Sequence, residues 1–213
     1  MRIVLLGKPG SGKGTQARKV SERFGYYHLS SGEVLREEIE KGTPRGKEVE
    51  EYVKRGEIGP EKLITGIVLN HIDEKNTGDS LILDGFPRTM YQAEKLDGIY
   101  PPDLCLLLEV SDREVFKRLS NRYVCRDCGR MCQLEDSNPN HKRCEECGGR
   151  LVQREDDTPE AIEMRLKVFE EQVAPVISHY RKKKLLHTLE GDTDPEEIYN
   201  NIRYTIMKLV GPN

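Results

Sequence analysis

A glycine-rich turn between an apolar run and a helical pattern constrains this chain more than any other feature. The apolar run Ile3–Leu6 leads into residues 7–15, which read Gly-Lys-Pro-Gly-Ser-Gly-Lys-Gly-Thr, and an amphipathic helical pattern follows. Glycines allow positive φ and leave room for several backbone N–H groups to point at one centre, while the helix N-terminus adds partial positive charge. This context predicts a phosphate-binding loop in which Lys13 reaches the β- and γ-phosphates.

One position of this loop departs from the stricter pattern. That pattern has Ser or Thr directly after the lysine, where the hydroxyl binds Mg²⁺. Here Gly14 takes that place and Thr15 comes next. A glycine-rich turn that binds no ligand is the alternative interpretation, and the combination of strand, helix and Lys13 favours phosphate binding over it.

Short apolar runs alternate with helical patterns along the rest of the chain. Buried strands are predicted at Leu81–Leu83 and Leu104–Val110, and a last strand is predicted at Leu185–Leu189. Continuous apolar runs between helices are typical of a parallel sheet covered on both faces, so the fold class is expected to be α/β. A helical stretch at about residues 30–59 and a cysteine-rich stretch at 122–157 interrupt this pattern.

Local signals predict where the helices begin and bend. Ser30 and Glu33 have the spacing of a capping box, and Asp112 is a candidate N-cap. Pro175 should kink the helix that it enters. Helix starts are further indicated by Thr43-Pro44 (with a stop near Gly56), Pro60, Thr158-Pro159 and Asp194-Pro195.

Composition excludes several classes of protein. The formal net charge is -3 over 213 residues, without the basic excess of a protein that wraps nucleic acid. No apolar run approaches the about 20 residues of a transmembrane helix, and no secretory signal is evident. We therefore expect a cytoplasmic protein with no membrane partner and no nucleic-acid partner. Its length suffices for one α/β core and one or two small inserts.

A carboxylate and an arginine follow the second predicted strand. Asp84 comes directly after Leu81–Leu83, and Arg88 lies four residues on. Ligands of open α/β sheets collect at the carboxyl ends of the strands. Asp84 could hold Mg²⁺ through water, and the planar guanidinium of Arg88 could clamp a phosphate. The alternative is that Asp84 caps a turn and Arg88 lies on the surface.

Four of the six cysteines form two C-x₂-C pairs separated by fifteen residues. Cys125, Cys128, Cys144 and Cys147 match the spacing of a zinc ribbon, and four sulfur ligands would make a closed, structural site. Free or disulfide-bonded thiols and an iron–sulfur cluster are the alternatives. Cys132 and His141 are rival ligands. Cys105 is expected to be a small buried hydrophobe, and the four other histidines, His28, His71, His179 and His187, to have packing or surface roles.

Three segments together resemble the adenylate kinases: Gly7–Gln16, Leu29–Arg36, and Asp84–Thr89 with Gln92. The resemblance covers essentially the whole chain. It implies a P-loop core (residues 1–29, 60–121 and 158–213), a helical AMP-binding insert (30–59) and a small zinc-ribbon-like lid (122–157). It also implies reversible transfer from MgATP to AMP to give two ADP, by a monomer with one structural Zn²⁺.

The resemblance further implies roles for individual residues. ATP would be bound by Gly10, Ser11, Gly12, Lys13, Gly14, Thr15, Arg118, Arg122, Met131, Cys132 and Thr193. AMP would be bound by Ser31, Arg36, Glu57, Ile58, Gly59, Gly85, Phe86, Pro87, Arg88, Gln92, Arg154 and Arg165, with Gln92 reading the adenine. The transfer itself would depend on Lys13, Arg88, Arg122, Arg154 and Arg165.

Three positions depart from the family pattern. Ser31 stands where threonine is commoner and keeps the hydroxyl. Gly59 stands where a larger apolar residue is common, which leaves the discrimination between bases open. Cys132 stands where related lids carry a tyrosine near the adenosine.

The chemistry explains why arginines rather than a general base are expected. An AMP phosphate is already anionic near neutral pH, so the reaction needs in-line positioning, charge neutralisation and exclusion of water. Asp156 and Asp157 are expected to orient lid arginines or to cap the following helix. The rival functions are a kinase for UMP or CMP, a nucleic-acid-binding zinc ribbon on an NTPase, and a nucleotide-sensing module.

Overall fold

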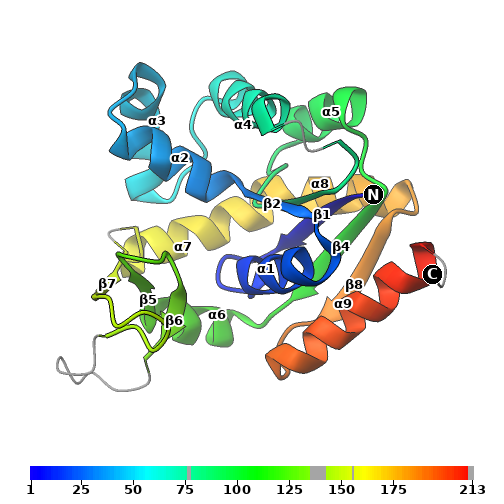
Figure 1. The fold of residues 1–213 in the computed structure, drawn as a ribbon. Coiled ribbons are helices and arrows are strands. Elements are labelled where there is room, and N and C mark those ends of the chain that lie inside the picture. The colour runs from blue at the N-terminus through cyan, green and yellow to red at the C-terminus, as the bar shows by residue number, and fades with distance from the viewer. Residues whose placement is uncertain (76–77, 135–142, 155, 211–213) are drawn as a thin grey trace.

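The computed structural model describes residues 1–75, 78–134, 143–154 and 156–210. Its centre is a five-stranded parallel sheet in the order β2-β3-β1-β4-β8 (Figure 1). The strands are β1 (Arg2–Gly7), β2 (Tyr27–Ser30), β3 (Leu81–Asp84), β4 (Leu104–Glu109) and β8 (Leu186–Glu190). The predicted α/β class is confirmed.

Helices cover both faces of this sheet, because side chains along each strand alternate between the faces. In β1, Val4 and Leu6 belong to the larger core, and Ile3 and Leu5 to the smaller one. The larger core lies under α2 (Ser31–Glu40), α3 (Pro44–Arg55), α4 (Glu61–Lys75), α5 (Met90–Ile99) and α8 (Ala174–Lys182). The smaller core lies under α1 (Lys13–Phe24) and α9 (Pro195–Val210).

A second, three-stranded antiparallel sheet follows α6 (Asp112–Ser120). Its order is β6-β5-β7, from β5 (Arg122–Cys125), β6 (Met131–Gln133) and β7 (Leu151–Gln153). α7 (Pro159–Val168) then returns the chain to the core. In Figure 1 the small sheet and the α2–α3 pair lie at the same end of the molecule, on either side of α7.

The helix signals are confirmed where they depend on proline and on a threonine cap. Thr43 and Thr158 each accept a hydrogen bond from a backbone N–H of the first turn, and proline follows each of them. Gly56 ends α3 in the left-handed conformation, as predicted. Pro175 does interrupt its helix: a π-helical turn, Phe169–Val173, separates α7 from α8. The turn accommodates a residue that cannot donate to the preceding turn.

Two capping predictions are wrong. Ser30 occupies the N-cap position of α2, but its side chain makes no cap hydrogen bond. Ser30 also ends β2, where it pairs with Asp84, and Glu33 lines a cavity instead of turning back to the helix end. The N-cap of α6 is Ser111 rather than Asp112, which is the first helical residue.

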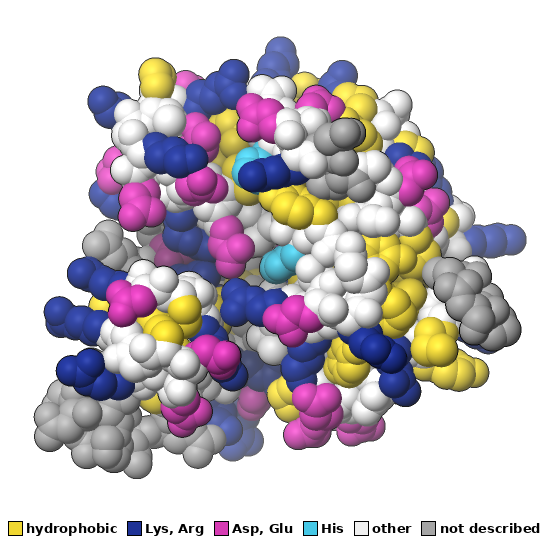
Figure 2. Space-filling view, viewed as in Figure 1, with side chains coloured by type: hydrophobic (Ala, Val, Ile, Leu, Met, Phe, Trp, Pro, Cys, Tyr) yellow, Lys and Arg dark blue, Asp and Glu magenta, His cyan; other side chains and the backbone are white. Residues whose placement is uncertain are grey.

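Among the residues that the structure describes, no helix is both long and apolar enough to cross a membrane. On the face in Figure 2, Lys and Arg side chains are interspersed with Asp and Glu side chains. That face therefore carries no broad patch of a single charge.

Candidate active site

The loop between β1 and α1 is built around the ammonium group of Lys13. Lys13 Nζ donates to the carbonyl oxygens of Gly7 (2.9 Å) and Lys8 (2.7 Å), and it lies 3.3 Å from Ser11 Oγ. Gly7 has φ 147°, and a Cβ there would lie 2.6 Å from the carbonyl oxygen of Leu108. Gly12, the N-cap of α1, has φ 95°. Both positions need glycine, and the result is a turn whose curvature surrounds one cation.

Burial makes this cation unusually acidic. Desolvation, together with the smaller effects of the charges on Arg88 and Arg122, lowers the pKa of Lys13 to about 8 against the opposing effect of Asp84. The carboxylate of Asp84 offsets only part of this shift in the pKa of Lys13. A phosphate between these cations would supply the missing negative charge.

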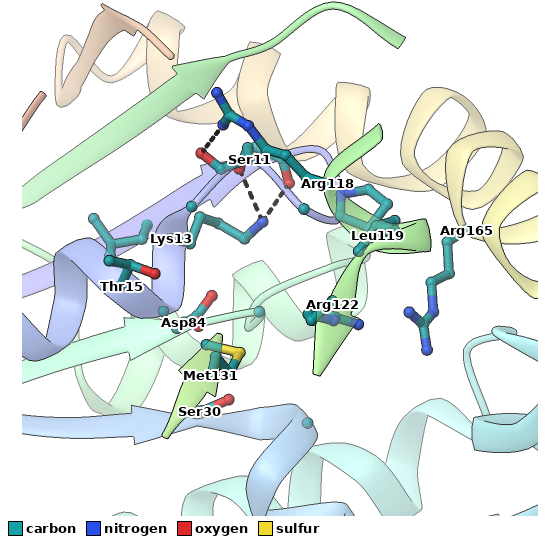
Figure 3. A pocket seen from close by; sticks show the side chains of 18 of the residues that line it. Ser11, Lys13, Thr15, Ser30, Asp84, Arg118, Leu119, Arg122, Met131 and Arg165 are labelled. Carbon is teal, nitrogen blue, oxygen red and sulfur yellow. Dashed lines mark hydrogen bonds between the residues drawn. The ribbon is translucent and has the colours of Figure 1, made fainter. Parts of the chain in front are cut away.

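One cavity of about 600 Å³ extends from this loop across the ends of the strands (Figure 3). Seven cationic side chains line it, against five carboxylates. The cations are Lys13, Arg36, Arg88, Arg118, Arg122, Arg154 and Arg165. The whole chain carries a formal charge of -3, so the excess of cations is local to the cavity. Such a concentration of positive charge is suited to a polyphosphate.

Asp84 faces Lys13 from the end of β3. Burial alone would raise the pKa of Asp84, but His28, Lys13 and Arg88 together lower it, so the carboxylate is ionised. A Cβ added at Gly14 would lie 3.2 Å from Asp84 Oδ2. The carboxylate thus stands beside the place where the stricter loop has its Mg²⁺-binding hydroxyl, and it fits a magnesium ion held through water.

Two buried aspartates hold three arginines in place. Arg122 Nε donates to Asp157 Oδ2 (2.7 Å), and Arg165 Nη1 donates to Asp157 Oδ1 (3.0 Å). Asp156 pairs with Arg165, and its Oδ2 lies 3.8 Å from Arg36 Nη1. The prediction that these aspartates orient arginines is confirmed.

Arg154 and Arg118 are positioned differently. Desolvation, with the charges of Arg36 and Arg122, lowers the pKa of Arg154 to about 10. Arg118 Nε donates to Glu114 Oε1 (2.9 Å) and its Nη2 donates to the carbonyl oxygen of Gly191 (2.9 Å). Arg118 therefore ties α6 to the segment after β8, while Arg154 has fewer compensating charges.

A smaller recess adjoins the main cavity, and Glu57, Gly85 and Arg88 line both. Ser31 Oγ donates to the carbonyl oxygen of Gly85 (2.7 Å). Gln92 is 1% exposed, and its Oε1 accepts from the backbone N–H of Arg88 (2.7 Å). Its Nε2 has no hydrogen-bond partner within the described residues, so the recess presents one buried donor.

The structure brings nearly all the expected nucleotide-binding residues to these two cavities. The ATP set, all in the main cavity, comprises Gly10, Ser11, Gly12, Lys13, Gly14, Thr15, Arg118, Arg122, Met131, Cys132 and Thr193. The AMP set divides between the main cavity (Arg36, Glu57, Gly85, Pro87, Arg88, Arg154, Arg165) and the recess (Ser31, Ile58, Gly59, Gln92). Phe86 lines neither, because its side chain is buried in the larger core.

Four residues in or next to these cavities were not predicted from the sequence to have a role there. His28 lies in β2, a strand that was not predicted, and its Nε2 lies 3.9 Å from Asp84 Oδ2. Tyr52 of α3 lines the recess. Glu33 and Glu114 supply carboxylates to the main cavity. All four depend on tertiary packing that residue spacing alone does not reveal.

The four cysteines of the C-x₂-C pairs converge in the small sheet. Their sulfur atoms all lie within 4.8 Å of one another, with 3.4 Å between Cys125 and Cys147 and 3.7 Å between Cys128 and Cys144. Zn–S bonds of about 2.3 Å in a tetrahedron would separate the sulfurs by about 3.8 Å. The donor set therefore fits a zinc ion. His141 lies outside the described residues, and Cys132 lines the main cavity.

Comparison with known proteins agrees with this geometry. The family model described as adenylate kinase matches residues 5–185. Curated relatives named adenylate kinase come from Archaeoglobus fulgidus (39% identical, over 98% of this chain and 99% of the relative) and Methanothrix thermoacetophila (40%, 98% and 99%). Another, from Thermodesulfovibrio yellowstonii, is 41% identical over 95% of this chain and 97% of its own length. These alignments span almost the full length of both partners.

Proposed function

The chain belongs to the adenylate kinase family, and from this premise we propose that it transfers the γ-phosphoryl group of MgATP to AMP, reversibly, giving two ADP. The observation that carries the proposal is the single cavity in which the Lys13 loop and six arginines converge, beside a recess with a buried amide donor. ATP would occupy the loop side, and the base of AMP would occupy the recess.

The chain's own residues would position and neutralise rather than exchange protons. An oxygen of the AMP phosphate attacks the γ-phosphorus in line, and the bond from that phosphorus to the β–γ bridging oxygen breaks. Lys13, Arg88, Arg122, Arg154 and Arg165 would balance the charge of the transferring group. The attacking oxygen is already anionic, so no general base is needed.

Two metal ions would assist in different ways. Asp84 would hold Mg²⁺ through water, and that ion supplies charge neutralisation at the β- and γ-phosphates. Cys125, Cys128, Cys144 and Cys147 would hold Zn²⁺, which offers no open coordination position and therefore acts on the stability of the small sheet.

We further propose that the chain consists of three functional parts. Residues 1–29, 60–121 and 158–213 would form the core, residues 30–59 the AMP-binding insert and residues 122–157 the lid. We also propose that the enzyme acts as a monomer in the cytoplasm, since one chain supplies every group that lines the cavity and its thiols suit a reducing compartment.

A coupled assay of ADP formation tests the proposal. The purified protein with MgATP should form ADP from AMP, with a kcat/KM well above those for CMP, UMP and GMP. A clear preference for CMP or UMP would favour the alternative, a pyrimidine monophosphate kinase of the same fold. Absence of ADP with every acceptor, despite intact folding, would contradict the kinase assignment.

A further inference from the structure

The recess beside the main cavity is lined by one aromatic side chain, five aliphatic side chains and four polar or charged ones, besides two glycines. Its lining residues include Val49, Tyr52, Ile58, Gly59, Ile64 and Gln92. Tyr52 comes from α3, while Gly59 lies in the segment that joins α3 to α4. The chain turns at the C-terminal end of α3 and so brings these two residues together.

Gly59 and Tyr52 are complementary in shape. Gly59 is buried, and its φ lies outside the left-handed region, so its backbone does not require glycine. A Cβ there would lie 3.5 Å from both Cγ and Cδ2 of the Tyr52 ring and 3.6 Å from Ile64 Cδ1. These are ordinary contact distances, so the ring of Tyr52 leaves room beside Gly59 for about one Cβ. Beyond that Cβ, the ring of Tyr52 occupies space that is free because residue 59 is glycine.

A cation holds the ring of Tyr52. The guanidinium carbon of Arg55 lies over it, 5.5 Å from the centroid. Arg55 Nη2 in turn donates to Glu57 Oε2 (3.1 Å). This cation–π contact and ion pair limit the freedom of the ring, so the recess has a positioned aromatic wall.

Ser31, Glu57 and Arg88 contribute polar groups to the recess, and Gln92 contributes a buried donor that has no hydrogen-bond partner among the described residues. This donor is Gln92 Nε2, while Gln92 Oε1 accepts from the backbone N–H of Arg88. A flat heteroaromatic ring with an acceptor nitrogen would satisfy this donor and pack against the tyrosine. Adenine has such a nitrogen and a large π surface.

We infer that Tyr52 is a specificity-determining residue, whose ring packs against the acceptor base in the room that Gly59 provides and favours a purine over a pyrimidine. The inference rests on the proposed function and adds to it the source of base selection. A purine overlaps the ring more than a pyrimidine does, and an aromatic contact of this kind strengthens binding by about tenfold or more.

The first test is the variant Tyr52→Ala, with Tyr52→Phe as its matched control. Tyr52→Ala should raise the KM for AMP by about tenfold and lower the ratio of kcat/KM between AMP and CMP by a similar factor. The KM for ATP and the kcat at saturating AMP should change less than about twofold, because the contact lies in the recess. Tyr52→Phe should match the parent protein.

A second test measures the coupling of the two positions. Gly59→Val should raise the KM for AMP, and the double variant Tyr52→Ile/Gly59→Val should raise it by less than the product of the single effects, because an aliphatic pair can refill the wall. If Tyr52→Ala has a lower thermal midpoint than the parent protein, Tyr52→Leu replaces it in the assay, because leucine keeps a large apolar side chain on α3.

The outcomes separate this inference from the proposed function. If the parent protein forms no ADP from AMP, both are overturned. If the parent protein is active and Tyr52→Ala or Tyr52→Leu leaves the KM for AMP and the AMP-to-CMP ratio unchanged, only the role of Tyr52 is overturned. Equal rises in the KM for AMP and for ATP would likewise show a general structural role and overturn base selection.

Discussion

At the scale of single residues, Lys13 is a positive charge buried in a site that contains other positive charges. Its ammonium group is enclosed by the loop that it serves and lies near Arg88 and Arg122. Desolvation therefore lowers its pKa from 10.5 to about 8. The folded protein binds this proton less tightly than the unfolded chain does, which links the residue to stability as well as to phosphate binding.

The linkage predicts a pH window. Between about pH 8 and 10.5 the unfolded chain holds a proton on Lys13 that the folded protein has released, so stability from this residue rises with pH. The thermal midpoint of the parent protein should therefore increase relative to that of Lys13→Met across this window. Thermal denaturation without nucleotide, at several pH values from 7 to about 10.5, measures the difference.

Lys62→Met, at an exposed position of α4, is the matched control and should show no such trend. A constant difference between the parent protein and Lys13→Met would contradict the burial of this charge. In the ADP-forming assay, Lys13→Met should lower kcat by about 10²- to 10³-fold, the effect of removing a positioned electrostatic group.

Asp157 is a second residue whose role follows from its contacts. Its carboxylate accepts from both Arg122 and Arg165, and its side chain is fully buried. Asp157→Asn should lower kcat by about 10- to 100-fold, because both arginines lose their fixed positions. It should also destabilise the fold by about 2–4 kcal/mol, since buried cations are left without full compensation.

Steady-state kinetics and denaturant titration of Asp157→Asn measure these two effects. The control is Asp79→Asn, because Asp79 is 80% exposed and lies 3.7 Å from Arg2 at the surface. Surface pairs of this kind contribute little. A kcat for Asp157→Asn equal to that of the control would mean that the aspartate does not orient the arginines that act in catalysis.

Site residues that belong to a local sequence motif could be predicted from the sequence. Site residues that reach the cavities only through tertiary packing could not. The loop from Gly10 to Thr15 and the Asp84–Arg88 pair could be located because glycine spacing and strand ends impose them locally. His28 and Tyr52 could not, because one lies in a strand that was not predicted and the other reaches the recess only through the packing of α3.

At the scale of elements, the small sheet depends on metal ligation more than on apolar burial. Among the residues that the structure describes, its core is a cluster of Cys125, Cys144 and Leu151, against which Tyr123, Cys132 and Leu134 pack. So few apolar side chains cannot compensate for the entropy of ordering the segment. Zinc bound by the four thiolates would provide the missing stabilisation.

Removal of the metal should therefore affect stability before chemistry. Cys144→Ser, or chelation of the parent protein, should lower the thermal midpoint by about 5–10 °C while reducing turnover at low temperature far less. Differential scanning calorimetry and metal analysis of the purified protein measure the effect. An equal loss of turnover and stability would mean that the metal takes part in the reaction.

Cys132→Ser is the matched control for this experiment. Cys132 packs against the same cluster but is absent from the four-sulfur group. The variant should retain one zinc per chain and the parent's thermal midpoint. Loss of the metal from Cys132→Ser would contradict the assignment of the four ligands.

Elements that the sequence did not predict have physical reasons for their weak signals. β2 has only four residues, with the sequence Tyr-His-Leu-Ser, and just one of its side chains is buried. It is held by parallel pairing with β3, which residue spacing cannot reveal. By contrast, β4 is apolar through most of its length and buried on both faces, so its pattern was sufficient.

At the scale of the whole molecule, charge is divided between surface and cavity. The chain is acidic overall, while the cavity has seven cationic side chains against five carboxylates. On the face in Figure 2 the two signs are interspersed, so the strongest local field is expected inside the site rather than on that surface. This arrangement favours a small polyanion over an extended nucleic acid.

Anion binding should therefore stabilise the protein in a saturable way, without any nucleoside. Tripolyphosphate at about 100 times its dissociation constant should raise the thermal midpoint by about 5–10 °C, because it binds only the folded state. Sodium chloride at equal ionic strength should give a smaller, unsaturable change, and about 0.5 M chloride should weaken tripolyphosphate binding by screening. Lys13→Met should lose most of the saturable part, because it removes the cation at the centre of the loop. An identical, linear response of the parent protein and the variant would mean that the salt acts on the general surface, and the charge of the cavity would then have no role in holding phosphate.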